Sequence, residues 1–357
     1  MKTRIELFRE KLREKEVDSA LVTSWQNVFY LSGFTGFGDA FLFITQQAQY
    51  ILTDSRYLVQ AKEECPDFDI KNIPVSDYGK IAGFIQEQNV KYIGFEDNHI
   101  SFLTYKKVTE LCTNCSFAAI GGIIEDIRCI KSADEIEIVR KACDIVVETF
   151  NDVLGFIKEG VSEKEVAAEI EYGIRKRGAD KTSFDTIVAS GYRGALPHGT
   201  ASDKVIKKGE AITMDFGAFY NGYCSDITRT VFLGEPDEKM REIYNVVLNA
   251  NKKAIDSFET GMTGRDLDQI AREYISNAGY GDEFSHGLGH GVGVQVHEEP
   301  RITKYGDKEL VEGMIFSIEP GIYVEGLGGV RIEDLATVVD GKLTVLTKNA
   351  PKEMIIL

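Results

Sequence analysis

The chain has 357 residues, of which 43% are hydrophobic and 27% are charged, and its formal net charge is -16. That length suits two domains, and the composition is ordinary for a globular protein. The acidic balance argues against nucleic acid and anionic membrane as partners, since both bind through basic patches. No apolar run approaches the ~18 residues of a membrane-spanning helix. Residues 1–20 lack the apolar stretch of a secretory signal, so we expect a cytoplasmic protein.

The first third of the chain alternates short strand and helix patterns. Ile5, Phe8 and Leu12 share one face of an N-terminal amphipathic helix. Strand-like and helical segments then alternate, which predicts a small α/β domain over residues 1–125. The CxxC pair in this domain, Cys112 and Cys115, has no second pair or histidine cluster near it, so we interpret both as structural or incidental thiols.

Residues 126–357 show one order of elements twice. Capping boxes at Ser132 and Ser162 open two helices, and Pro236 and Thr263 open two more. A pair of strands follows each pair of helices, at residues 211–232 and 313–339. The repeated order predicts a pseudo-two-fold domain in which helices back a curved antiparallel sheet, so the fold class is α/β (α+β).

The first strand pair is a β-hairpin around Asn221-Gly222, the strongest short signal for a two-residue type I′ turn. This register places Asp215 opposite Thr228, and it places Asp226 diagonally from Asp215 on the same face, ~7–8 Å away. Two carboxylates aimed at one point repel each other unless one binds a proton or a cation lies between them.

The second strand pair adds two more carboxylates. If Val324 and Val330 flank a loop over residues 325–329, then Glu319, Arg331 and Glu333 lie on one face. Each half of the domain would then deliver two carboxylates to the middle of the sheet.

Four of the five histidines lie in this domain. They are His198 and, within twelve residues, His286, His290 and His297. Alternating glycines at 287–293 make a regular helix unlikely there, so we expect a glycine-lined strand or loop and not a helical zinc-protease site. Carboxylates with imidazoles suit Mn²⁺ or Co²⁺, with Fe²⁺ or Zn²⁺ as alternatives, and they exclude a thiolate zinc site. So many anionic ligands would serve two ions ~3.5–4 Å apart.

Four segments carry a family resemblance: MDFGAFYNGYCSDITRT, HGLGHGVGVQVHEEP, SIEPG and GVRIED. They resemble the metal-binding segments of the Xaa-Pro peptidases, aminopeptidase P and prolidase, which have a pita-bread fold and a creatinase-like N-terminal domain. The resemblance covers essentially the whole chain. It implies five metal ligands, with Asp226 and Glu333 bridging two ions: Asp215, Asp226, His290, Glu319 and Glu333.

The chemistry expected of such a site begins with a water that two metal ions convert to a bridging hydroxide. We interpret Glu319 as general base and proton shuttle. By the resemblance, His198 and His297 lie on the substrate side and stabilise the oxyanion. His286 and Arg331 would support the ligands, with Arg331 steadying the carboxylate two residues away.

The resemblance implies a proline-containing peptide as substrate and a homodimer as the assembly. It leaves aminopeptidase P and Xaa-Pro dipeptidase open, and the proline-binding residues are not evident. A creatinase-like hydrolase and a non-catalytic binding module are the alternatives on the same fold. Both usually lack some of the metal-binding carboxylates, and this sequence has all of them.

Overall fold

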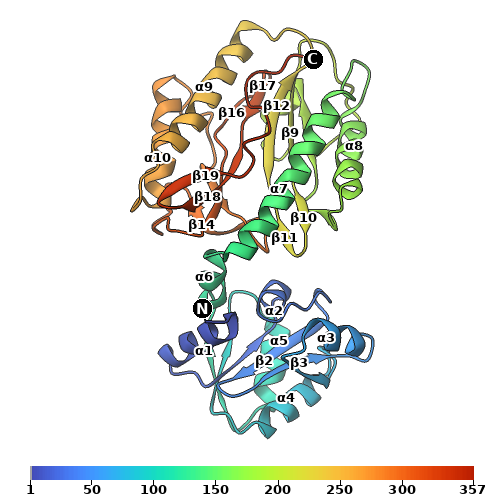
Figure 1. Ribbon diagram of the computed structural model, residues 1–357, viewed down its shortest axis with the longest axis vertical. Coiled ribbons are helices and arrows are strands. Elements are labelled where there is room, and N and C mark those ends of the chain that lie inside the picture. Colours follow the sequence, from blue (N-terminus) through green and yellow to red (C-terminus); the bar gives the residue numbers. More distant parts are fainter. Residues whose placement is uncertain (1) are drawn as a thin grey trace. The chain divides into compact units, whose positions relative to one another are not determined.

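The computed structural model describes residues 2–357, which form two compact units (Figure 1). One unit ends at Arg128 and the other spans Cys129–Leu357. The boundary expected from the sequence, after residue 125, falls within helix α6 (Ile123–Cys129), and those domain limits stay a prediction. Of the helices within residues 2–357, none is long and apolar enough to cross a membrane.

The N-terminal unit is a six-stranded mixed sheet in the order β4-β3-β2-β1-β5-β6. Its first helix buries Ile5, Phe8 and Leu12, as the sequence predicts. The mixture of parallel and antiparallel neighbours confirms a small α/β fold. The strands are β1 (Ser19–Val22), β2 (Ala40–Thr45), β3 (Gln49–Thr53), β4 (Asp69–Asn72), β5 (Tyr92–Phe95) and β6 (Ser116–Ala119), and the helices are α1 (Arg4–Glu14), α2 (Trp25–Ser32), α3 (Leu58–Glu64), α4 (Tyr78–Glu87) and α5 (Phe102–Leu111).

Two helix pairs flank the strands of the C-terminal unit (Figure 1). They are α7 (Ala133–Leu154) with α8 (Glu163–Lys176), and α9 (Glu238–Asp256) with α10 (Gly264–Asn277). Capping boxes at Ser132, Ser162 and Thr263 open three of them, and Asp237 caps the fourth. Each cap satisfies backbone N–H groups that the first turn of a helix leaves without a partner.

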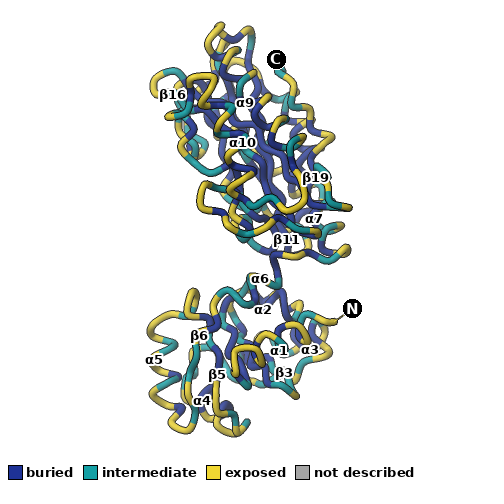
Figure 2. Tube along the Cα trace, turned by 90° about the vertical axis from the view of Figure 1, so that its left-hand side faces the viewer, coloured by how far each residue is buried: buried dark blue, intermediate teal, exposed yellow. Residues whose placement is uncertain are grey.

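Each helix pair packs on the strands through its own hydrophobic core. The first core joins α7 and α8 to β8, β9 and β12, and the second joins α9 and α10 to β14, β15 and β18, with Ala211 and Phe232 of the first half at its edge. Figure 2 shows the buried residues concentrated along the strands, with exposed positions on the outer faces of the helices. The strands of the first half are β7 (Lys181–Thr182), β8 (Ile187–Ser190), β9 (Ala211–Phe216), β10 (Ala218–Tyr220), β11 (Tyr223–Cys224) and β12 (Ile227–Phe232), with the short helix η1 (Gly191–Ala195); those of the second half are β13 (Gly289–Gly291), β14 (Glu298–Ile302), β15 (Ile315–Ile318), β16 (Gly321–Val324), β17 (Gly328–Arg331), β18 (Asp334–Val339) and β19 (Lys342–Val345).

The hairpin over residues 211–232 has the predicted register. Asp215 pairs with Thr228, and Tyr220 pairs with Tyr223 across the turn. Asn221 and Gly222 both have positive φ, 48° and 83°, as a type I′ turn requires. The ribbon is interrupted between β9 and β10 and between β11 and β12, and Asp226 lies at the second interruption.

The loop of the second hairpin is two residues shorter than predicted. Val324 pairs with Gly328 and not with Val330, so the loop covers residues 325–327. Gly326, at φ 78°, and Gly328, at φ 147°, adopt conformations that allow the tighter turn. A shift of two residues preserves the face on which a side chain lies, because strand side chains alternate with a period of two. The expectation that Glu319 and Glu333 share a face therefore survives this two-residue change in register.

A buried arginine ties the C-terminal segment to the strands that carry the carboxylates. Arg229, in β12, donates to Asp334 at 2.8 Å and to the carbonyls of Ala350 and Pro351 at 3.0 and 3.1 Å. Lys352 donates to the other oxygen of Asp334 at 2.5 Å. The side chains of Arg229 and Asp334 are each 1% exposed, so removing one partner would leave an unpaired buried charge.

We therefore expect Arg229→Met to lower the free energy of unfolding by about 3–5 kcal/mol. The matched control is Arg241→Met in α9, whose ion pair with Glu235 is 44% and 75% exposed; its loss should cost less than about 1 kcal/mol. Urea denaturation of both variants with chelator present would measure the losses without a contribution from bound metal. If both variants lost the same free energy of unfolding, the buried Arg229 network would not stabilise the fold more than an exposed ion pair does.

Candidate metal centre

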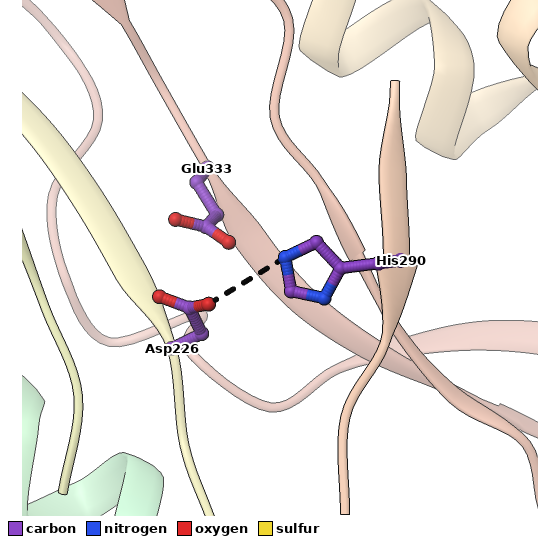
Figure 3. Close-up of side chains that lie close together, drawn as sticks. All are labelled: Asp226, His290 and Glu333. Atoms are coloured by element: carbon purple, nitrogen blue, oxygen red, sulfur yellow. Dashed lines mark ion pairs between the residues drawn. The ribbon is translucent and has the colours of Figure 1, made fainter. Parts of the chain in front are cut away.

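Three side chains from distant parts of the chain meet at the middle of the C-terminal unit. Asp226 precedes β12, His290 lies in β13 and Glu333 precedes β18, and their ligand atoms lie within 4.8 Å of one another (Figure 3). Within residues 2–357 this is the group of histidine, cysteine and acidic side chains whose spacing suits a metal ion. Cys112 and Cys115 are not part of it.

The other two predicted ligands adjoin this cluster. His290 Nε2 lies 3.2 Å from Glu319 Oε1 and 3.7 Å from Asp226 Oδ2. Asp215 accepts a hydrogen bond from Arg331 at 2.6 Å, and its charge acts on Asp226 and Glu333. The structure therefore brings together the five residues that the sequence singled out.

The glycines around His290 are required by close packing. A Cβ at Gly289 would lie 2.0 Å from the carbonyl oxygen of Ser317, and one at Gly291 would lie 2.1 Å from that of Glu299. Both distances are far below van der Waals contact, so no larger residue fits. The segment is a short strand followed by a loop, as the glycine spacing indicates.

Crowding of buried carboxylates perturbs their ionisation. Burial, and then the charges of Glu333 and Asp215, raise the pKa of Asp226 well above its usual range. Burial, and then Glu319 and Asp215, do the same to the pKa of Glu333. Burial would also raise the pKa of Glu319, but the hydrogen bond and charge of His290 lower it to about 2. Burial also raises the pKa of Asp215, against the opposing charge of Arg331. Three of the four carboxylates thus resist ionisation unless positive charge is supplied.

Three buried oxygens in this cluster accept no hydrogen bond: Asp215 Oδ1, Asp226 Oδ1 and Glu333 Oε1. Buried carboxylate oxygens without a partner are costly, and they are rare in folded proteins. They belong to three of the five converging residues, and with the imidazole of His290 they form a hard oxygen and nitrogen donor set. That donor set fits a divalent cation.

Neighbouring groups orient the carboxylates, partly against expectation. Thr228 donates to Glu333 Oε2 at 2.7 Å. Arg331 was expected to steady Glu333, two residues away, and it acts on Glu333 through its charge, which partly offsets the effect of burial in raising the pKa of that carboxyl. Its side-chain hydrogen bonds go to Asp215, Thr228, the carbonyl oxygen of Pro197 and the hydroxyl of Tyr323. The long guanidinium side chain passes Thr228 and reaches the other half of the domain, while Thr228 supplies the donor to Glu333.

His286 lies beside the cluster. Its Nε2 is 2.9 Å from the hydroxyl of Tyr323, and its Nδ1 is 2.7 Å from the carbonyl oxygen of Gly287. Tyr323 joins His286 to Arg331, whose guanidinium it contacts at 2.8 Å. A supporting role for His286 stays a prediction, and Tyr323 is the residue that connects His286 to the cluster through hydrogen bonds.

His198 and His297 are exposed at the edge of the cluster. The ring of His297 lies 4.1 Å from that of His290, centroid to centroid, in an edge-to-face arrangement. Burial lowers the pKa of His297, and so do the nearby His290 and His198, against the opposite effect of Glu319. Both imidazoles are thus available to a molecule that approaches the carboxylates from solvent.

Sequence reasoning missed two residues of this site. Ser317 donates to Glu319 Oε1 at 2.9 Å and accepts from the backbone N–H of His290 at 3.0 Å. Its position two residues before Glu319 puts it on the same strand face, and that spacing could have identified it. Tyr323, four residues after Glu319, has an even spacing of the same kind, but nothing in the sequence indicates that its hydroxyl joins His286 to Arg331.

Comparison with known proteins agrees with this architecture. Residues 137–340 match the model of metallopeptidase family M24, and residues 4–130 match the creatinase/prolidase N-terminal domain. An Xaa-Pro dipeptidase of Pyrococcus horikoshii is 42% identical over 99% of this chain and 97% of its own.

Solved structures give the same result. The Xaa-Pro dipeptidase from Bacillus anthracis superposes with a TM-score of 0.95 at 41% identity, over 99% of both chains. The X-Pro aminopeptidase from Thermotoga maritima superposes with a TM-score of 0.92 at 37% identity, over 100% of both chains. The chain belongs to metallopeptidase family M24 and carries a creatinase-type N-terminal domain.

The proposed ligands can be tested by metal content. We expect Asp226→Asn and Glu333→Gln each to abolish stoichiometric metal binding, because each removes one anionic donor from the centre of the cluster. The matched control is Asp203→Asn, whose side chain is 89% exposed. Elemental analysis after dialysis against Mn²⁺ or Co²⁺ measures the content. Full metal retention by both variants would refute the ligand assignment.

Proposed function

We propose that this metallopeptidase hydrolyses the bond between any residue and a following proline, with two divalent ions at the cluster, Mn²⁺ or Co²⁺ before Zn²⁺ or Fe²⁺. The observation that carries the proposal is the convergence of Asp215, Asp226, His290, Glu319 and Glu333, three of them with a buried, unpartnered oxygen. The names of the relatives that match the full length of the chain support the choice of substrate.

Five residues would hold the ions. By the family resemblance, Asp226 and Glu333 would be shared, Asp215 would serve one ion, and His290 with Glu319 would serve the other. When bound, two divalent ions would lower the pKa of a water molecule and polarise the scissile carbonyl. The thiols of Cys112 and Cys115 have no part in this, and burial raises the pKa of both.

The chain's own groups then handle the proton and the negative charge. Glu319 would accept a proton from the attacking water and return it to the proline nitrogen as the bond breaks. His198 and His297 donate to the carbonyl oxygen as it gains charge. Arg331 and Thr228 fix the positions of Asp215 and Glu333.

A dipeptidase is the first choice, and aminopeptidase P is the second. Similarity to Xaa-Pro dipeptidases from both Bacillus anthracis and Pyrococcus horikoshii favours the first. Similarity at 37% identity to an X-Pro aminopeptidase favours the second. The difference is whether the site accepts residues beyond the proline. The homodimer expected from the family resemblance also stays a prediction.

The function is tested with three peptides. With Mn²⁺ or Co²⁺ present, we expect rapid release of alanine from Ala-Pro, and release from Ala-Ala that is at least about tenfold slower. Ala-Pro-Pro separates the two candidates, since an aminopeptidase cleaves it as well as or better than Ala-Pro. Equal rates on Ala-Pro and Ala-Ala would overturn the proline preference, and no cleavage of any of the three would overturn the peptidase proposal.

The role of His297 has a test of its own. We expect His297→Ala to lower kcat about 10²–10³-fold, because an oxyanion donor is lost, with metal content unchanged. Steady-state kinetics with parallel elemental analysis would measure both quantities. If His297→Ala lost its metal, the residue would be a ligand and not a donor to substrate.

A further inference from the structure

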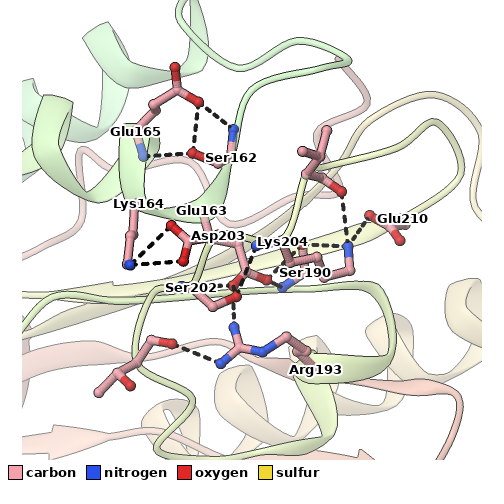
Figure 4. Close-up of polar contacts among 12 residues, drawn as sticks. Ser162, Glu163, Lys164, Glu165, Ser190, Arg193, Ser202, Asp203, Lys204 and Glu210 are labelled. Atoms are coloured by element: carbon pink, nitrogen blue, oxygen red, sulfur yellow. Dashed lines mark hydrogen bonds and ion pairs between the residues drawn. The ribbon is translucent and has the colours of Figure 1, made fainter.

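A second polar cluster lies at the start of α8, around a carboxylate that the chemistry above does not use (Figure 4). The side chain of Glu163 is fully buried. It accepts the backbone N–H and hydroxyl of Ser190 at 2.8 Å each, and those of Ser202 at 3.1 and 2.6 Å. Arg193 also donates to it, through Nη1. These described donors come from residues 190–202, so one carboxylate holds both ends of that segment.

The segment between these ends carries His198. Arg193 extends the contact with Glu163 inward, because its Nη2 donates to the carbonyl oxygen of Thr200 at 2.8 Å. On the other side of His198, the carbonyl oxygen of Pro197 accepts from Arg331 at 3.2 Å. Pro197 and Thr200, on either side of His198, thus each accept a hydrogen bond from an arginine. Arg331 belongs to the metal centre, and Arg193 connects to α8.

Burial explains why Glu163 must act as an anchor. A carboxylate without solvent is tolerated only when charge and hydrogen bonds compensate it fully, and here a loop supplies all the described compensation. Lys204 closes the cluster by donating to Ser190 Oγ at 2.9 Å and to Glu210 at 2.6 Å. Displacing the loop would break several charge-assisted bonds together, so the loop has one strongly preferred position.

We propose that Glu163 and Arg193 are positioning residues for the reaction: they fix the segment of residues 190–202 so that His198 faces the metal centre. The proposal rests on the substrate-side role of His198 in the proposed function. An oxyanion donor must be placed to within a fraction of an ångström, because a displacement of ~1 Å can cost ~10²-fold in rate.

The test is a double-mutant cycle on the metal-loaded enzyme with Ala-Pro. We expect Arg193→Gln to lower kcat at least about tenfold with little change in KM, since His198 acts on the transition state. In a His198→Ala background the same substitution should change kcat less than about twofold. Additive losses would overturn the proposal, because Arg193 would then act through something other than His198.

The matched control lies on the same two elements. Lys164 and Asp203 form an exposed ion pair, with side chains 58% and 89% exposed, beside the Glu163 cluster (Figure 4). Lys164→Ala should leave kcat, KM and thermal stability unchanged. If Arg193→Gln does not fold, Ser202→Ala can replace it, because it removes one donor from the same carboxylate. We expect a smaller loss of kcat, which should again disappear in the His198→Ala background.

A measurement without turnover separates this proposal from the function itself. Hydrogen exchange of the amides in residues 190–202 should be faster in Arg193→Gln than in wild type and Lys164→Ala, with exchange in the N-terminal unit unchanged. Unchanged exchange would overturn the anchoring role. If wild type fails to cleave Ala-Pro but the exchange result holds, the proposed function fails while the anchor stands.

Discussion

The C-terminal unit is organised around four carboxylates that its fold forces together in a buried space. Asp226 and Glu333 lie too close, and too far from water, to ionise side by side without a cation. A core built for stability alone would place apolar side chains there. Without a cation these carboxylates bind protons, and a bound divalent cation would offset the cost of placing them together.

Each half of the unit anchors a histidine-bearing segment by a buried carboxylate on its second helix. In the first half Glu163, on α8, binds the N–H of Ser190. In the second half Asp268, on α10, binds the N–H of Leu288 at 2.8 Å and pairs with Arg272, which donates to the carbonyl oxygen of His286. The pseudo-two-fold repeat thus extends from the order of elements to the way in which helices position loops.

Much of this arrangement was predictable from the sequence, where a short-range rule applied. Period-two alternation and an Asn-Gly turn predict the Asp215–Thr228 register, and capping boxes predict the helix starts. Long-range contacts were not predictable in this way. Glu163 reads as an ordinary acidic residue in the first turn of a helix, and only the fold reveals that residues 190–202 enclose it. For the same reason, Arg331 was expected to act on Glu333, two residues away, and its hydrogen bond to the distant Asp215 was not predicted.

The two halves of the site are linked by one guanidinium. Arg331 contacts Asp215, Thr228 and the carbonyl of Pro197, so it joins a carboxylate of the cluster, the donor to Glu333 and the segment of His198. Its planar fork of donors can hold several acceptors in fixed directions, which a lysine cannot do. The guanidinium therefore ties the position of Asp215 to that of the segment that carries His198. Glu163 and Arg193 hold the same segment from α8, so His198 lies between two sets of contacts, one to α8 and one to the metal centre.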